Sequence, residues 1–105
     1  LTRINLLCNA FTGPLRISST LTQLRTLDIS QNGLTGAIPE ATVYPSLEIL
    51  HLYNNMFTSL PDSLGKLRNL NSLMVSNNNL TVVPASVVNC VLLTNLQLFN
   101  NQLVF

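Results

Sequence analysis

Few residues of this chain have side chains that could do acid–base or nucleophilic chemistry. The single histidine is His51, and the acidic residue Asp28 precedes it by 23 positions. Ser30 and Cys8 are the candidate nucleophiles that a fold could bring near this pair. A nucleophile, an imidazole and a carboxylate in contact would suit acyl transfer. Whether they meet depends on the elements that carry Asp28 and His51.

The interval of 23 residues between Asp28 and His51 is the period of the whole sequence. Large apolar residues stand eight, five and three positions before each of five asparagines and two positions after it. The asparagines are Asn9, Asn32, Asn55, Asn78 and Asn101. With about half of the residues apolar, chance would fill all twenty apolar positions roughly once in a million. The chain is therefore predicted to be an array of one repeated unit.

Each unit is predicted to contain a short strand with one buried face. Apolar residues alternate at its fourth and sixth positions, as Leu50 and Leu52 do. Strands of successive units would pair in parallel at about 4.8 Å, and the chain must return behind the sheet each time. The asparagine ends the strand, where its amide can bond to backbone groups that the turn leaves unpaired. The five asparagines are predicted to form a buried structural ladder rather than a site.

The pattern LxxLxLxxNxL resembles that of the leucine-rich repeat family along the whole chain. The resemblance implies an α/β solenoid, a shallow right-handed horseshoe with a parallel sheet on its concave side. Residues 1–23, 24–46, 47–69 and 70–92 would be full repeats, and 93–105 the strand half of a fifth. Segments 11–15 and 34–39 are similar to the LTGxIP pattern of plant-type extracellular repeats. Segments 57–61 and 80–84 look like the shorter LTxLP form.

The return segments are predicted to form 3₁₀ or one-turn helices on the convex side. Pro61 and Pro84 stand where such a turn would begin, and the runs 62–67 and 85–90 place apolar residues three apart. Neither end of the sequence resembles the polar cap that a solenoid needs. The chain is therefore expected to be a segment of a longer solenoid, covered by neighbouring repeats. As a complete protein it would dimerise end to end or aggregate.

Side chains between the core positions of each strand are predicted to face the concave side, the usual ligand surface of the family that the chain resembles. This face would be uncharged except for Arg3 and Asp28, and rich in amides, methionines and aromatic rings. That mixture suits recognition of a protein or peptide, although single exposed apolar side chains are also ordinary on protein surfaces. The residues predicted to bind a partner are Asp28, Ile49, His51, Tyr53, Met56, Met74 and Phe99.

The same arrangement would place Asp28 and His51 on adjacent strands, one strand spacing apart. A cross-strand pair that tunes recognition is favoured over catalysis, because a sheet face offers neither a pocket nor oxyanion donors. One histidine and two distant cysteines cannot form a tetrahedral metal site. The segment is predicted to be no enzyme and to hold no metal or cofactor.

Composition and short motifs limit the partners and the compartment. A net charge of +1 with 9% charged residues argues against nucleic acid or an anionic membrane as partner, and no apolar run is long enough to insert in a membrane. Cys8 is predicted to be exposed and Cys90 buried, too far apart for a disulfide, which favours a reducing compartment. Low charge and the LTGxIP resemblance favour instead a secreted or cell-surface protein, with a cytoplasmic location as the alternative. Asn79-Leu80-Thr81 is a glycosylation sequon whose occupancy the sequence leaves open.

Three functions are consistent with the sequence. The leading one is an interaction module that binds a protein or peptide through its concave sheet. The second is a structural spacer in an assembly or surface coat, which contacts others through its edges and convex side. The third is part of a receptor ectodomain, as the LTGxIP resemblance implies, whose catalytic domain would lie outside this segment. The convex charges that a spacer would use are Arg16, Glu40, Asp62, Lys66 and Arg68.

Overall fold

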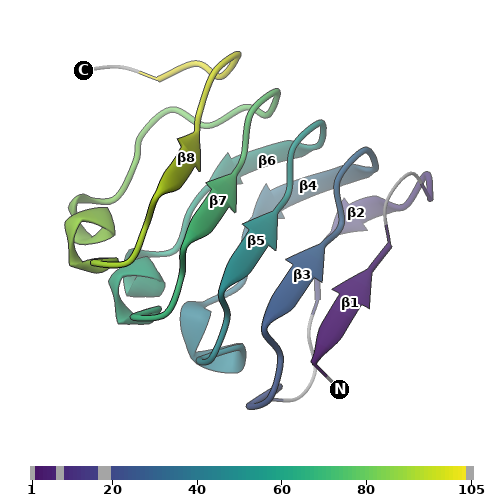
Figure 1. Cartoon of the computed structure of the whole chain (residues 1–105). Coiled ribbons are helices and arrows are strands. Elements are labelled where there is room, and N and C mark those ends of the chain that lie inside the picture. The colour runs from purple at the N-terminus through teal and green to yellow at the C-terminus, as the bar shows by residue number, and fades with distance from the viewer. Residues whose placement is uncertain (1, 7–8, 17–19, 104–105) are drawn as a thin grey trace.

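The computed structural model describes residues 2–6, 9–16 and 20–103, and its elements follow the sequence period. One strand from each repeat joins a parallel sheet in the order β1-β3-β5-β7-β8 (Figure 1). Asp28 pairs with His51 and His51 with Met74, so successive strands are in register at the repeat interval. This sheet confirms the predicted solenoid. Its strands are β1 (Arg3–Asn5), β3 (Thr26–Asp28), β5 (Ile49–His51), β7 (Ser72–Met74) and β8 (Asn95–Gln97).

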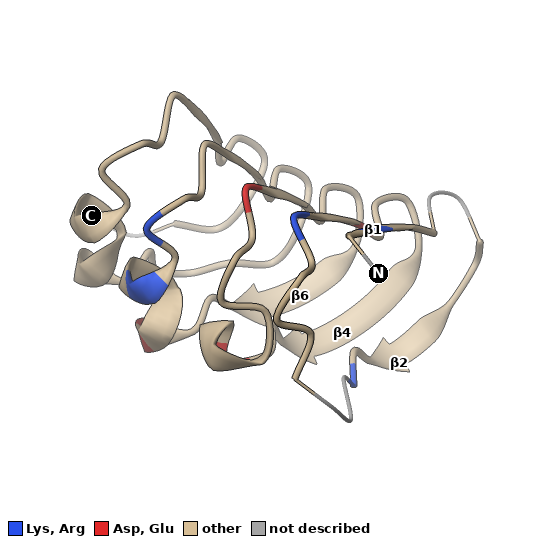
Figure 2. Ribbon diagram, turned by 60° about the horizontal axis from the view of Figure 1, so that its bottom comes forward, with Lys and Arg blue, Asp and Glu red and all other residues tan. Residues whose placement is uncertain are grey.

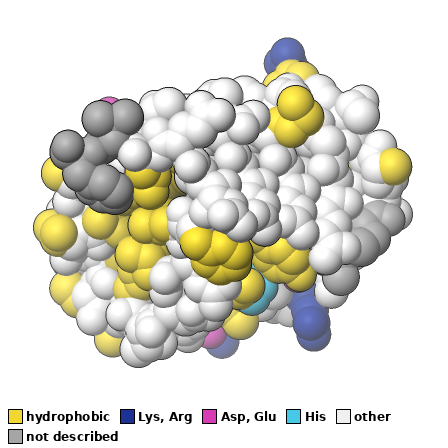
Figure 3. Space-filling view, turned by 90° about the horizontal axis from the view of Figure 1, so that it is seen from above, with side chains coloured by type: hydrophobic (Ala, Val, Ile, Leu, Met, Phe, Trp, Pro, Cys, Tyr) yellow, Lys and Arg dark blue, Asp and Glu magenta, His cyan; other side chains and the backbone are white. Residues whose placement is uncertain are grey.

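The core lies between this concave sheet and the return segments, at the predicted apolar positions. The central residue of each inner strand is a leucine with at most 1% of its surface exposed, as in Leu27, Leu50 and Leu73. Burying such a side chain contributes about 2 kcal/mol of transfer free energy. In the outer repeats Leu6 and Leu96 are 39% and 43% exposed, because each has a neighbouring repeat on one side only. Figure 3 shows hydrophobic side chains gathered on the side of the molecule that carries β8.

The return segments contain a second parallel sheet, which the sequence pattern did not predict. Its strands β2 (Thr12–Pro14), β4 (Gly33–Ala37) and β6 (Met56–Ser59) lie behind the first sheet (Figure 1). Gly13 and Gly36, the glycines of segments 11–15 and 34–39, have φ of +79° and +80°. Glycine takes this left-handed backbone without the steric cost that a Cβ would bring.

In the described part of the chain, three 3₁₀ helices on the convex side confirm the predicted short turns. They are η1 (Ala41–Val43), η2 (Asp62–Lys66) and η3 (Ala85–Asn89). Pro61 and Pro84 come directly before η2 and η3, and their carbonyls accept hydrogen bonds from Leu64 N–H and Val87 N–H at 3.1 Å. Each proline therefore opens its turn from the residue before the helix, not from the first helical position.

The asparagine ladder has the predicted bonding but not the predicted burial throughout. Asn78 Oδ1 accepts the N–H of Phe57 at 3.0 Å, and Asn78 Nδ2 donates to the carbonyls of Leu52 at 2.9 Å and Val75 at 3.0 Å. Each such amide ties the end of its own strand to the preceding repeat. Asn55 and Asn78 are buried, whereas the outer members are half-buried or, for Asn9, exposed. The prediction of five buried asparagines was wrong. Asn9 and Asn101 lie in the first and last repeats, which have a neighbour on one side only, and Asn32 lies next to the open first repeat.

Candidate functional site

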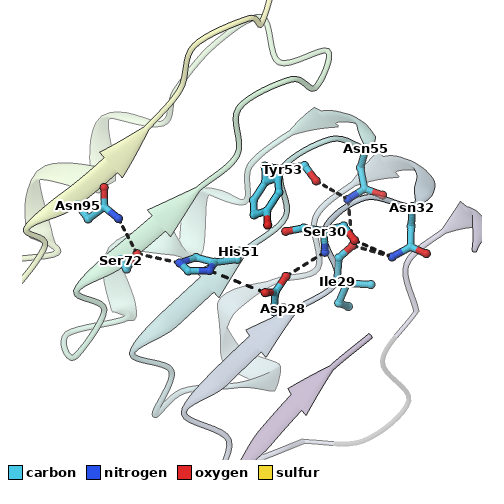
Figure 4. Close-up of polar contacts among 9 residues, drawn as sticks. All are labelled: Asp28, Ile29, Ser30, Asn32, His51, Tyr53, Asn55, Ser72 and Asn95. Carbon is cyan, nitrogen blue, oxygen red and sulfur yellow. Dashed lines mark hydrogen bonds and ion pairs between the residues drawn. The ribbon is translucent and has the colours of Figure 1, made fainter. Parts of the chain in front are cut away.

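A row of polar side chains crosses the concave sheet from β3 to β8. His51 Nδ1 lies 4.0 Å from Asp28 Oδ2, and His51 Nε2 lies 2.9 Å from Ser72 Oγ (Figure 4). Asn95 Nδ2 donates to Ser72 Oγ at 3.1 Å, and Gln97 Nε2 donates to Asn95 Oδ1 at 3.3 Å. These five residues, Asp28, His51, Ser72, Asn95 and Gln97, are called the concave polar row below. Every strand of the sheet after β1 contributes to it.

Hydrogen bonding orients the side chains of the concave polar row. Because Ser72 Oγ accepts from Asn95, its own hydrogen can be donated to His51 Nε2. A neutral imidazole then carries its hydrogen on Nδ1, the nitrogen that faces Asp28. Asp28 Oδ1 in turn accepts the N–H of Ser30 at 3.1 Å. The side chains of His51 and Asp28 are 23% and 16% exposed. Both are therefore fixed by their neighbours and still accessible to a ligand.

Ser72 replaces the nucleophiles that the sequence suggested. It lies at the third position of its repeat on β7, the strand that pairs with the strand of His51. The repeat interval already placed the two residues on adjacent strands. Ser30 is fully buried, and Cys8 lies outside the described residues. The Asp28–His51 distance of 4.0 Å exceeds a hydrogen bond, and the described ranges contain no pocket. Such an open row suits recognition better than acyl transfer.

Six of the seven residues predicted to bind a partner lie in or just after the concave strands, and the seventh, Met56, does not. Asp28, Ile49, His51 and Met74 are half-buried in the concave strands, and Tyr53 and Phe99 follow the ends of β5 and β8. The rings of His51 and Tyr53 have centroids 6.5 Å apart, and Phe99 is 58% exposed. In Figure 3 the histidine borders hydrophobic side chains on part of its circumference. Met56 is 50% exposed but begins β6, so it belongs to the second sheet and not to the concave strands.

Amides at the eighth position of the repeat have a backbone role. They were expected to face a ligand, yet Gln31, Asn54, Asn77 and Asn100 have φ between +56° and +59°. Asparagine tolerates this left-handed conformation better than most residues with a side chain. The turn after each strand therefore accounts for these residue types without a ligand.

Serines at the seventh position are also not part of the open face. Ser30 and Ser76 were expected to face the concave side, but at most 1% of each is exposed. Within the described part of the chain their hydroxyls have no hydrogen-bond partner. They share a column with Tyr53 and Phe99, and the short serine side chain does not extend past such neighbours. The concave face accordingly presents the polar row and the two rings, beside half-buried Ile49 and Met74.

Cys90 is buried as predicted. Its exposed fraction is 5%, and its thiol lies 3.3 Å from the carbonyl oxygen of Leu64. Burial raises the pKa of the Cys90 thiol, and the positive charge of Arg68 opposes this shift. A thiol with a raised pKa is less reactive, because the thiolate is the nucleophile. Cys90 thus acts as a small core residue.

Among residues 2–6, 9–16 and 20–103, no three His, Cys, Asp or Glu side chains are grouped as metal ligands would be. In the same ranges no helix has the length and apolar character to cross a membrane.

One parallel strand per 23-residue unit, tied to the preceding unit by an asparagine, defines a repeat solenoid with one open polar and aromatic face. Family models described as leucine-rich repeat match residues 45–103 and 23–43. The chain therefore belongs to the leucine-rich repeat family. Comparison with curated proteins gives no match.

Three solved structures, two of them from Arabidopsis thaliana, are similar to this chain. One is a chain of the BIR3–SERK2 complex from Arabidopsis thaliana, with a TM-score of 0.90 and 30% sequence identity. The match covers 97% of the present chain and 57% of the chain in the complex. The BIR2 ectodomain from Arabidopsis thaliana has a TM-score of 0.84 and 28% identity over 96% and 55%. A TDR receptor has a TM-score of 0.89 and 30% identity over 98% and 18%. The chain thus spans little more than half of the first two.

These similarities confirm the plant-type character of the repeats. Family membership and similarity to receptor ectodomains together support a role in protein–protein interaction.

Proposed function

We propose that the chain binds a protein or peptide through its concave sheet, at the surface formed by the concave polar row with Tyr53 and Phe99. The observation that carries this proposal is the hydrogen bonding within the row. Ser72 contacts both His51 and Asn95, so their side chains are ordered before a ligand arrives. Preorganised groups lose less conformational entropy on binding than mobile ones do.

The chemistry of this surface favours a neutral or weakly charged partner. Asp28 is the acidic residue of the row, and exposed Arg3 on β1 is the basic residue of the same sheet. Amide and hydroxyl groups can align the partner's backbone, and the two rings can anchor an apolar side chain.

The surface is small for a stable complex. Five strands at about 4.8 Å span about 20 Å, whereas a specific interface needs about 800 Å² from each partner. We therefore infer weak binding by this segment and a larger interface once neighbouring repeats extend the sheet. Similarity to chains nearly twice its length, such as the one in the BIR3–SERK2 complex, supports this inference. The receptor ectodomains among these structures also support an extracellular or cell-surface location for the chain.

Removing both rings tests the binding surface. Peptides are selected from a display library on the wild-type chain, and their affinity for the variant Tyr53→Ala/Phe99→Ala is measured by biolayer interferometry. Loss of two anchoring rings is expected to weaken binding at least tenfold, about 1.4 kcal/mol. Both positions retain solvent contact, so circular dichroism should show an unchanged fold. Undiminished binding to the folded variant would show that the proposed surface is wrong.

The spacer hypothesis predicts that contacts depend on the convex side and not on the concave sheet. Charged residues lie on the convex turns, while the strands of the second sheet carry none (Figure 2). Glu40 already has a partner within the chain, the Ser63 hydroxyl of the next repeat. Reversing the exposed charges in Lys66→Glu/Arg68→Glu is expected to leave peptide binding within twofold of wild type. Loss of assembly by this variant, with unchanged peptide binding, would favour the spacer.

A further inference from the structure

The sequon Asn79-Leu80-Thr81 lies at the rim where the concave sheet passes into the return segments. It is the one Asn-x-Ser/Thr motif in the sequence. The threonine of the sequon recurs at the same position of every full repeat. The asparagine does not recur, because the residue type at its position varies from repeat to repeat. The position is occupied by Ala10, Gly33, Met56, Asn79 and Gln102.

Burial alternates along the sequon, as it does in the preceding repeat. Leu80 is fully buried, Asn79 is half-buried and Thr81 is exposed. The equivalent residues of β6 show the same alternation, with Phe57 buried between exposed Met56 and Thr58. In an extended segment, residues on either side of a buried one point to the opposite side. Asn79 and Thr81 therefore face away from the core together.

Backbone hydrogen bonds hold the sequon in this orientation. The N–H of Asn79 donates to the carbonyl of Phe57 at 2.8 Å, and the N–H of Leu80 donates to Asn101 Oδ1 at 2.9 Å. On either side along the rim, Met56 is 50% exposed and Gln102 is exposed. A bulky group on Asn79 would therefore extend into solvent from a fixed point between open neighbours.

We propose that Asn79 is an N-glycosylation site, and that its glycan covers the rim and leaves the concave polar row accessible. This proposal rests on the extracellular location proposed above. The donor is a lipid-linked oligosaccharide diphosphate, presented by a host transferase. A bond forms between Asn79 Nδ2 and the anomeric carbon, the bond from that carbon to the diphosphate oxygen breaks, and Nδ2 releases one proton to solvent. The lipid diphosphate leaves, and no atom changes its oxidation state.

Such a glycan would restrict where a partner can approach. Asn79 shares the rim with Met56, which begins the second sheet, whereas the concave polar row lies on the strands of the first sheet. A sugar at Asn79 therefore obstructs contacts with Met56 and the second sheet before it reaches the row. Of the residues predicted to bind a partner, Met56 is the one that this glycan would shield from a partner.

The test is the mass of the full chain secreted from eukaryotic cells behind a cleavable signal peptide. Wild type is expected to carry one glycan that peptide N-glycosidase removes, leaving aspartate at position 79. Thr81→Ser should keep the glycan, and Asn79→Gln and Thr81→Ala should lose it. The matched control Met56→Asn creates a second sequon with Phe57 and Thr58 on the same rim. An unmodified Asn79 in a host that modifies this control would overturn the proposal.

A second measurement tests the position of the glycan. Peptides selected on the bare chain are expected to bind the glycosylated and enzymatically deglycosylated proteins within twofold of each other. A tenfold loss caused by the glycan would overturn the inference that it leaves the row accessible. Peptide binding by the ring variant Tyr53→Ala/Phe99→Ala is measured on deglycosylated protein. An error in the proposed binding surface is therefore distinguished from an error in the proposed glycosylation of Asn79.

Discussion

Replacement of Asn78 by aspartate is expected to destabilise the chain by about 3 kcal/mol or more, a large part of the 5–15 kcal/mol typical of a folded domain. The Asn78 amide is buried, and its Nδ2 donates to the carbonyls of Leu52, Val75 and Ser76 at 2.9–3.2 Å. A carboxylate cannot donate, so it would direct negative charge at three carbonyl oxygens away from water. Asparagine and aspartate have nearly the same shape, so the loss reports bonding and charge rather than packing.

Urea denaturation followed by circular dichroism measures this effect. Burial should raise the pKa of the new carboxyl in the folded state, and its protonated form can donate. The Asn78→Asp variant should therefore lose stability as pH rises, and be more stable at acidic than at neutral pH relative to wild type. Asn69→Asp is the control, because Asn69 is exposed and its change should stay within about 0.5 kcal/mol. Equal denaturation midpoints for the two variants would refute the structural role of the ladder.

Substitution of Gly65 by alanine is expected to cost about 2 kcal/mol through the contact between η2 and η3. A Cβ on Gly65 would lie 2.6 Å from the carbonyl oxygen of Ser86 and 2.9 Å from its Cβ. The closer atom belongs to the backbone, so no side-chain rotation relieves the overlap. The two convex turns must separate, which opens the buried layer around Leu64 and Cys90.

Gly33→Ala is the matched control for Gly65→Ala, since a Cβ there lies 3.2 Å from the carbonyl of Phe11 at its closest. Its cost, measured by thermal unfolding, should be clearly smaller. Ser86→Gly should not rescue Gly65→Ala, because the overlapping oxygen belongs to the backbone. Full rescue would show that the side chain of Ser86, not its backbone, limits the approach of the two turns.

The 23-residue period of the sequence predicted most of the fold and part of the candidate site. A 23-residue interval places Asp28 opposite His51 whatever the details of the turns, because equivalent strands of a solenoid pair in register. The helical turns after Pro61 and Pro84 were likewise predictable from local residue types. The second sheet was not, since β2, β4 and β6 lack the alternation of large apolar residues that identifies a strand.

The sequence alone determined the solenoid, the position of the asparagines and the pairing of Asp28 with His51, because these depend on spacing that every repeat shares. The tertiary structure decided which groups meet across repeats. Ser72 reaches His51, Met56 turns into the second sheet, and Gly65 admits the backbone of Ser86, because each outcome depends on side-chain direction and on the distance between neighbouring turns. Such distances are set by packing, which no single repeat encodes.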